Sequence, residues 1–169
     1  MALRALIYER RSELSAAMNC AQEALILLSA RDWGVLVGLP LSVLLTALTA
    51  AGRYEDAEKW LDTPPPEALF HTLLSLPYHQ ARGRLYLATS RPRAALVEFQ
   101  ACGGLMAFWG LDVSCLVTWQ ADTALAMLAL GEGDAARQLL EDHLKGRKPG
   151  LPRARGASLR ALAAVSDSE

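Results

Sequence analysis

The chain has 169 residues, 52% of them apolar and 7% aromatic, and its 17 basic and 18 acidic side chains leave a formal net charge of −1. This near-neutral charge excludes the class of strongly basic proteins that bind polyanions. We therefore expect no direct contact with nucleic acid and no attraction to an anionic membrane. Leu and Ala, both strong helix formers, dominate the apolar residues. The composition therefore predicts an all-α fold with a well-filled core.

The first periodic stretches cover residues 2–9 and 13–30, with a break near Arg11 and Ser12. The next pair covers residues 35–51 and 54–61 and is hinged at Gly52 and Arg53. Residues 33–52 carry no charge and are long enough to span a membrane. Pro40 in the middle, and hydroxyl side chains at helical spacing, favour a buried helix of a repeat instead.

Residues 63–66, Thr-Pro-Pro-Pro, predict an extended spacer because consecutive prolines remove backbone donors and clash with a preceding turn. A third pair is predicted over residues 69–89 and 92–108, with Pro92 in a first helical turn. Pro77 leaves an alternative in which the helix begins near Leu76 and residues 68–75 form a separate short helix or turn.

Asp112 or Ser114 is predicted to cap a helix that continues to Leu130, and Asp134 to cap a helix over residues 135–145. A last helix over residues 152–164 has no partner in the sequence, so its apolar face would be exposed. Two interpretations follow: the chain is a fragment of a larger protein, or this helix packs across a homodimer.

One phrase recurs about every forty residues: a helix-length apolar run, a tight turn, and Ala-x-x-x-(Phe or Leu) in a second amphipathic stretch. Its alanines are Ala57, Ala95 and Ala136, and a weaker copy places Ala17 one further interval upstream. We therefore predict a tetratricopeptide-like right-handed superhelix of antiparallel helix pairs. It forms a single helical-repeat domain over residues 1–169, with repeats at 1–30, 35–61, 69–108 and 112–146 and an unpaired terminal helix at 152–164.

The tetratricopeptide pattern is matched best in the third pair, where Gly83, Tyr86, Ala95 and Phe99 stand at the expected offsets. Glycine and alanine let two helix backbones approach closely, and the two aromatic rings fill the gaps around them. His79 and Arg82 occupy the positions of the pattern's Trp and Leu, so the match is partial. The predicted packing residues are Ala57, Gly83, Tyr86, Ala95, Phe99 and Ala136.

From residue 78 onward a series of short motifs has a specific order, although each alone is weak. They are Ala81-Arg82-Gly83-Arg84-Leu85, Ala94-Ala95-Leu96, Phe108-Trp109-Gly110, Trp119, Ala124-Leu125-Ala126-Met127-Leu128-Ala129-Leu130-Gly131, Ala136-Arg137 and Pro152-Arg153-Ala154. In this order they resemble the helical-repeat region of large ATP-binding LuxR-family transcriptional regulators, most strongly over residues 81–162.

The resemblance implies an ATPase module, a tetratricopeptide-like superhelix and a DNA-binding helix-turn-helix in the parent protein. This sequence contains no Gly-x-x-x-x-Gly-Lys-(Ser/Thr) phosphate loop and no recognisable recognition helix after the last repeat. What remains resembles the middle section, which is expected to receive an inducer or a partner protein.

No catalytic, cofactor or metal site is predicted, because the histidines and cysteines share no ligand spacing and no nucleophile motif. An odd number of separated cysteines favours buried thiols in a reducing compartment, here the cytoplasm. We expect the histidines to be surface or helix-packing residues. The residues concerned are His71, His79, His143, Cys20, Cys102 and Cys115.

Two charged segments each have two interpretations. The carboxylates of Glu55, Asp56 and Glu58 resemble an acidic cluster, but acidic residues early in a helix are typical of helix capping. Residues 145–160 hold six basic side chains and no acidic one, which fits either phosphate contact or a solvated loop and helix start.

A polar stripe on the first helices is the predicted ligand-binding surface, because first helices face the concave groove of a tetratricopeptide superhelix. The alternative is that these side chains are merely tolerated there. The candidates are Ser42, Thr46, Thr49, Gln80, Arg84, Thr118 and Asp122. The predicted function is a non-catalytic interaction or effector-receiving domain of a LuxR-type regulator, binding a protein, a peptide or a small molecule; the alternatives are a stand-alone adaptor and an α-helical enzyme.

Overall fold

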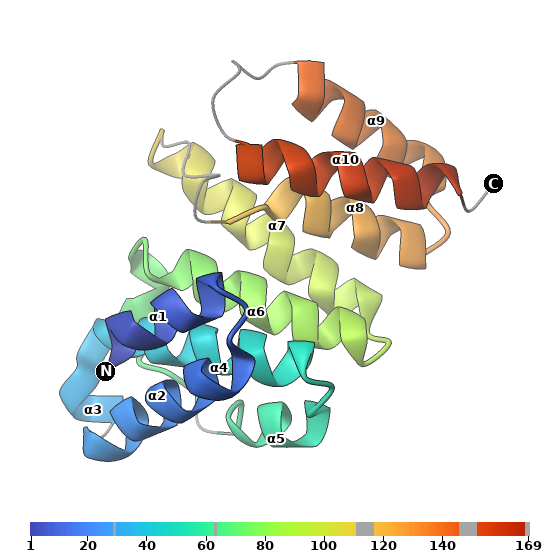
Figure 1. Cartoon of the computed structure of the whole chain (residues 1–169). Coiled ribbons are helices and arrows are strands. Elements are labelled where there is room, and N and C mark those ends of the chain that lie inside the picture. The colour runs from blue at the N-terminus through green and yellow to red at the C-terminus, as the bar shows by residue number, and fades with distance from the viewer. Residues whose placement is uncertain (29, 63, 111–116, 146–151, 168–169) are drawn as a thin grey trace. The chain divides into compact units, whose positions relative to one another are not determined.

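The computed structural model (Figure 1) describes the chain except for residues 29, 63, 111–116, 146–151 and 168–169. Every regular element in the described part is a helix, which confirms the predicted all-α class. Two compact units are present, Met1–Thr89 and Ser90–Glu169, and each is described by itself.

The first unit contains six α-helices and two 3₁₀ turns in its described residues. They are α1 (Ala2–Arg10), α2 (Leu14–Leu27), α3 (Ala30–Trp33), η1 (Gly34–Val37), α4 (Gly38–Ala50), α5 (Tyr54–Lys59), η2 (Glu67–His71) and α6 (Ser75–Ala88). The break predicted near Ser12 separates α1 from α2. The single helix predicted over residues 35–51 is instead a 3₁₀ turn followed by α4.

Helix α4 is the centre of the first unit and packs against α1, α2, α5 and α6. Figure 1 shows it between α2 and α6. A helix that is apolar on all sides needs cover on all sides, and neighbouring helices bury most of α4, including Leu44, Leu45 and Leu48 at 0% exposure. This explains the uncharged run at residues 33–52. No helix in the described ranges combines the length and the apolar character that a membrane span requires.

Prolines mark the helix starts. Pro40 and Pro77 are the third residues of α4 and α6, in the first turn, where a missing N–H breaks no helical hydrogen bond. The alternative interpretation of Pro77 is therefore confirmed: α6 begins at Ser75, and η2 is a separate short turn. Pro64 to Pro66 are non-helical, as predicted for a spacer.

The second unit contains α7 (Pro92–Phe108), α8 (Trp119–Ala129), α9 (Gly133–Lys145) and α10 (Pro152–Ser166). Helix α8 packs against the other three. Asp112 and Ser114 lie outside the described residues, but their predicted role as caps of this helix is wrong, because α8 begins at Trp119 and Thr118 directly precedes it. The predicted cap at Asp134 is wrong: the Glu132 carbonyl already accepts the Ala136 N–H at 3.0 Å, which places Asp134 inside the first turn of α9.

The expectation that the last helix has no partner is also wrong. Helix α10 packs against α8 and α9, where its small and apolar side chains join the core of the second unit. Its buried residues are Ala154, Ser158, Ala161 and Val165, and its exposed ones include Arg153, Arg155 and Arg160. Helix α10 thus covers its neighbours with an apolar face and presents a polar one to solvent.

The same backbone turn recurs along the chain. Residues with left-handed φ follow α1, α4, α6 and α8, at Ser12 (60°), Gly52 (71°), Ser90 (59°) and Gly131 (82°). Their intervals are the same as those between Ala17, Ala57, Ala95 and Ala136. In three of these turns, the next backbone N–H donates to a carbonyl five residues back, as in a Schellman motif: Glu13 to Tyr8, Arg53 to Leu48 and Glu132 to Met127, each at 2.9 Å. The period seen in the alanines is therefore also a period of the backbone.

Candidate ligand-binding residues

The three hydroxyl residues of α4 lie in different surroundings. Ser42 is 5% exposed, and its Oγ donates to the Leu39 carbonyl at 2.9 Å, within its own helix. Thr46 and Thr49 are half-buried, and the Thr49 Oγ1 atom is enclosed with no hydrogen-bond partner in the described residues. The Ser42 hydroxyl is thus already used by the backbone and the Thr49 hydroxyl is closed off from a ligand, so Thr46 is the most favourable of the three for ligand contact.

Gln80 and Arg84 stand one turn apart on α6 and so share a face. Gln80 is buried, at 7% exposure, and Arg84 is half-buried. Because α4 and α6 pack against each other, the structure brings the five first-unit candidates onto two adjacent helices.

The remaining candidates, Thr118 and Asp122, belong to the second unit. Both are 6% exposed, and the Thr118 Oγ1 donates to the Asp122 Oδ2 at 3.2 Å. This hydrogen bond ties the residue preceding α8 to the first turn of that helix. It gives both polar groups a structural role whether or not a ligand binds there.

None of the seven candidates is a fully exposed side chain. Four are buried, Ser42, Gln80, Thr118 and Asp122, and three are half-buried, Thr46, Thr49 and Arg84. A ligand that uses the stripe would therefore have to contact the half-buried set first. The binding role of the stripe stays a prediction, and these three residues are its most accessible members.

The packing residues predicted from the repeat are almost all interior. Ala57, Ala95, Phe99 and Ala136 are 0% exposed, and Gly83 is buried as well. Tyr86 is half-buried. An alanine that is fully buried in each second helix, α5, α7 and α9, agrees with a close-packing role for this repeated position.

A cluster of aromatic and cationic side chains surrounds Phe70, a residue that the sequence patterns did not single out. The Phe70 ring lies 5.4 Å from the His79 ring and 6.1 Å from the Tyr78 ring, measured between centroids. The Arg82 guanidinium lies 5.1 Å from the Tyr78 centroid and 5.7 Å from that of Phe70. His79 and Arg82, which replace the pattern's Trp and Leu, thus pack with an aromatic ring supplied by η2.

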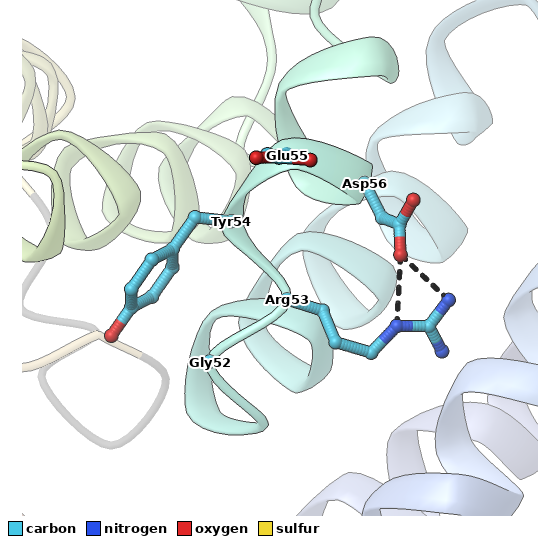
Figure 2. Close-up of a pocket in the computed structure, with 5 residues that line it drawn as sticks. All are labelled: Gly52, Arg53, Tyr54, Glu55 and Asp56. Carbon is cyan, nitrogen blue, oxygen red and sulfur yellow. Dashed lines mark hydrogen bonds and ion pairs between the residues drawn. The ribbon is translucent and has the colours of Figure 1, made fainter.

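A surface depression of about 260 Å³ lies at the turn between α4 and α5, lined by Gly52, Arg53, Tyr54, Glu55 and Asp56 (Figure 2). Arg53 reaches toward Asp56, with its Nε 2.9 Å from Oδ2, while Tyr54 points the other way. The Lys59 Nζ donates to the Asp56 Oδ1 at 3.0 Å. The hydrogen bonds from Lys59 and then Arg53 lower the pKa of Asp56 below its ordinary value of 3.8.

The Asp56 carboxylate at this depression is therefore paired with two cations, Arg53 and Lys59. Glu55 and Asp56 lie in the first turn of α5, where carboxylates are favourable to the helix dipole. The arrangement supports the helix-dipole interpretation for Glu55 and Asp56, whereas Glu58 lies in the last turn of α5.

The titratable and thiol side chains are dispersed. His71 is exposed, His79 buried and His143 half-buried, while Cys102 is buried and Cys20 is only half-buried against the first core. Cys115 lies outside the described residues. Among the residues that the structure describes, no group of three or more His, Cys, Asp or Glu side chains is arranged to hold a metal ion.

Searches of protein-family models, of curated proteins and of solved structures found no match to this chain.

Proposed function

We propose that this chain is a tetratricopeptide-like right-handed superhelix that acts as the non-catalytic interaction or effector-receiving segment of a cytoplasmic LuxR-type transcriptional regulator. It would bind a protein, a peptide or a small molecule and pass the signal to neighbouring domains of the parent protein. The proposal rests on the repeat and on the order of motifs noted in the sequence.

The recurring left-handed turn is the observation that carries the proposal. Its spacing of about forty residues lies within the range of helical-repeat arrays. A residue other than Gly in this conformation is uncommon, and Ser takes it at two of the four turns. The backbone geometry is thus kept where the side chain does not favour it, which supports a repeated unit over an incidental succession of helices.

The packing order adds a second line of support. In the first unit, α1 contacts α2 and α4, α2 contacts α4, and α4 contacts α5 and α6. In the second unit, α7 contacts α8, α8 contacts α9 and α10, and α9 contacts α10. In both units, the first helix of a pair contacts the second helix of the same pair and the first helix of the following pair, as expected of stacked helix pairs. Helix α10 takes the place of a next first helix in this order.

A signalling role places one physical requirement on the ligand. An effector shifts a conformational equilibrium only if its affinity differs between the two states. Contacts to half-buried residues such as Thr46 and Arg84 would meet this requirement if the packing of α4 against α6 differed between the two states.

Thermal-shift measurements with sugars, metabolites and anions test the proposal. A ligand present at about 100 times its Kd stabilises the folded state by about 2.7 kcal/mol, which raises the Tm by roughly 5–10 °C for a chain of this size. For a ligand found in this way, Thr46→Val should reduce the shift, since it removes a hydroxyl and keeps the shape. Ser42→Ala is the matched control, because its hydroxyl is held by Leu39; it should lower the Tm of the free protein and leave the shift unchanged.

A stand-alone adaptor remains the alternative function, and the gene separates the two. An ATPase module encoded upstream and a helix-turn-helix downstream would support the regulator, and their absence would support the adaptor. Turnover of a substrate by the purified chain would contradict both.

A further inference from the structure

Two apolar side chains of α1 are exposed at repeat positions that are buried in the first helices α4, α6 and α8. Leu3 is 69% exposed and Ile7 is 55% exposed. The residues at the equivalent positions, counted along the repeat intervals, are buried on all three later helices. They are Val43 (3%) and Ala47 (0%) of α4, Ala81 (1%) and Leu85 (0%) of α6, and Asp122 (6%) and Ala126 (0%) of α8.

The neighbours of each first helix explain this difference. Helix α4 packs against the pair before it, α1 and α2, helix α6 packs against α4 and α5, and helix α8 packs against α7. Among the described helices, α1 packs against α2 and α4, which both follow it in the chain. The face of α1 that carries Leu3 and Ile7 is therefore the place where the preceding helix lies in the later pairs.

The same comparison sets aside the exposed apolar residues of α7. Val97 is 65% exposed, but the equivalent residues of α2, α5 and α9 are exposed as well: Asn19, Lys59 and Gln138. The outer side of a second helix thus faces solvent in every pair. Phe108 is the last residue of α7, beyond the reach of the shorter second helices, so the repeat gives it no covered counterpart.

The exposed apolar residues of α2 are set aside for the same reason. Ile26 is 79% exposed, and the residues at its position on α7 and α9, Gly104 and Lys145, are also exposed. Leu27 is the last residue of α2, and Leu28 follows it with an extended backbone. Only the α1 face combines exposed apolar side chains with equivalents that are buried on each of the other registered helices.

Three arginines surround the exposed pair. Arg4, Arg10 and Arg11 are exposed and lie three or four residues from Ile7, which places them on the same face of the helix. Arg10 and Arg11 form long ion pairs with neighbouring glutamates, at 3.8 and 3.7 Å. Each guanidinium has five N–H donors, so these pairs leave donors for a further carboxylate.

These cations indicate the chemistry of the occupant. The equivalent residues of α4 are uncharged: Leu44, Ala50 and Ala51. Two α1 faces would repel each other through their arginines, and the outer side of α10 is also basic, with Arg153, Arg155 and Arg160 exposed. The charges therefore favour a helix with carboxylates at its edges over a second copy of this chain.

We propose that the α1 face, formed by Leu3, Ile7, Arg4, Arg10 and Arg11, binds an acidic amphipathic α-helix of a partner protein, in the way that α4 receives α2. The partner helix places Ala and Leu side chains over Leu3 and Ile7, as in other helix-in-groove complexes. Its Glu or Asp side chains meet the arginines in charge-assisted hydrogen bonds.

This face differs from the predicted ligand-binding stripe. The α1 equivalents of Ser42, Thr46 and Thr49 are Ala2, Leu6 and Glu9, on another side of the helix. The proposal rests on the repeat and not on the regulator role or on an effector, so helix binding and effector binding are measured separately.

Helical peptides of about 20 residues, displayed on phage and selected against the whole chain, test both the shape and the charge of the occupant. One side of each peptide is fixed as Ala and Leu, and the edge positions vary among Glu, Gln and Lys. We expect the selected peptides to carry Glu at the edges. In fluorescence anisotropy with the purified chain, Ile7→Glu should weaken binding of such a peptide by about tenfold or more.

Two further variants separate the apolar and charged contributions. Ile26→Glu is the matched control, because Ile26 is more exposed than Ile7 and lies outside this face; it should leave the affinity unchanged. Combining Arg10→Glu with Arg11→Glu should weaken the Glu peptide and allow the same peptide with Lys at its edges to bind. Circular dichroism checks that the variants are folded, as expected for changes at exposed side chains.

The proposal is overturned if no peptide is recovered, if the selected peptides show no preference for Glu, or if Ile7→Glu and Ile26→Glu weaken binding equally. Peptide-induced amide shifts in NMR that are centred on α1 would support it, and shifts that leave α1 unchanged would refute it. Self-association of the chain that Ile7→Glu abolishes would assign this face to a second copy and would also overturn the proposal.

Discussion

Gly103 on α7 allows the Trp119 ring of α8 to lie against the α7 backbone, and replacing it with alanine should destabilise the second unit. An added Cβ at residue 103 would lie 2.7 Å from Trp119 Cη2 and 2.9 Å from both Cζ2 and Cζ3. These atoms belong to a rigid ring, so either the indole or the helix must move. The neighbouring Gly104 has nothing within 4 Å of the same position.

The two adjacent glycines make a matched pair. Both lie inside α7, so Gly→Ala gives each variant the same gain in helix propensity, about 0.5–1 kcal/mol. Overpacking costs about 1–3 kcal/mol and applies only to Gly103→Ala. The difference in unfolding free energy between the two variants should therefore be about 1–3 kcal/mol, with Gly104→Ala the more stable, and it isolates the steric effect of the Trp119 contact.

Urea denaturation followed by circular dichroism measures this difference, at concentrations where the chain is monomeric. Because the chain contains two compact units, hydrogen exchange at the α8 amides shows whether the loss occurs in the second unit. Replacing Trp119 with Leu should remove most of the penalty of Gly103→Ala. Equal stability of the two alanine variants would refute the reasoning, and a penalty that persists without the indole would assign it to another neighbour.

Four further substitutions test the interior and the α4–α5 turn. Thr123→Val should raise the free energy of unfolding by about 1 kcal/mol in urea denaturation, because the Thr123 hydroxyl is buried without a partner in the described residues. Thr118→Val should instead lower it by about 1.5–3 kcal/mol, because it removes a hydrogen bond to the Asp122 carboxylate. Leu44→Ala should cost about 2–5 kcal/mol, since this side chain is fully enclosed in the first core. Asp56→Asn should be slightly less stable than wild type at neutral pH. This difference in stability should fade as the pH falls from 3.8 through the lower pKa that Asp56 has in the folded protein, because the carboxylate stabilises the folded state only while it is ionised. A carbon-13 titration that places the pKa of Asp56 at or above 3.8 would contradict the ion pairs.

Local signals in the sequence predicted most helix boundaries because they act through the backbone of a few residues. Pro92 and Gly52 fix a helix start and a helix end whatever the remainder of the chain does. The buried alanines were likewise predictable, since they recur at the same place in a phrase of about forty residues. Asp134 shows the limit of such signals: a good capping residue does not cap when the helix already begins before it.

Contacts between distant segments could not be predicted in the same way. Phe70 sits in a short 3₁₀ turn without periodicity, and its role appears only when α6 places His79 and Arg82 beside it. The burial of Ser42 depends on how closely neighbouring helices surround α4, and the sequence of α4 alone gives no measure of that. The contacts of α10 were not predicted, because the repeat pattern suggests that a helix is covered by the second helix of its own pair. In the structure, α8 and α9 of the preceding pair cover the apolar face of α10 instead.

Equivalent positions of the repeat show how one backbone accommodates different cores. Leu44, Arg82 and Thr123 are separated by the same intervals as the three later turns, at Gly52, Ser90 and Gly131. Leu44 is fully enclosed by apolar neighbours, Arg82 lies against two aromatic rings, and the Thr123 hydroxyl is buried without a described partner. Because the turn geometry is set by the backbone, the side chain at this position is free to vary as long as nearby segments, such as η2 beside Arg82, fill the space it leaves. A sequence pattern that requires Leu at this position therefore misses two of the three copies even though the turn recurs in each.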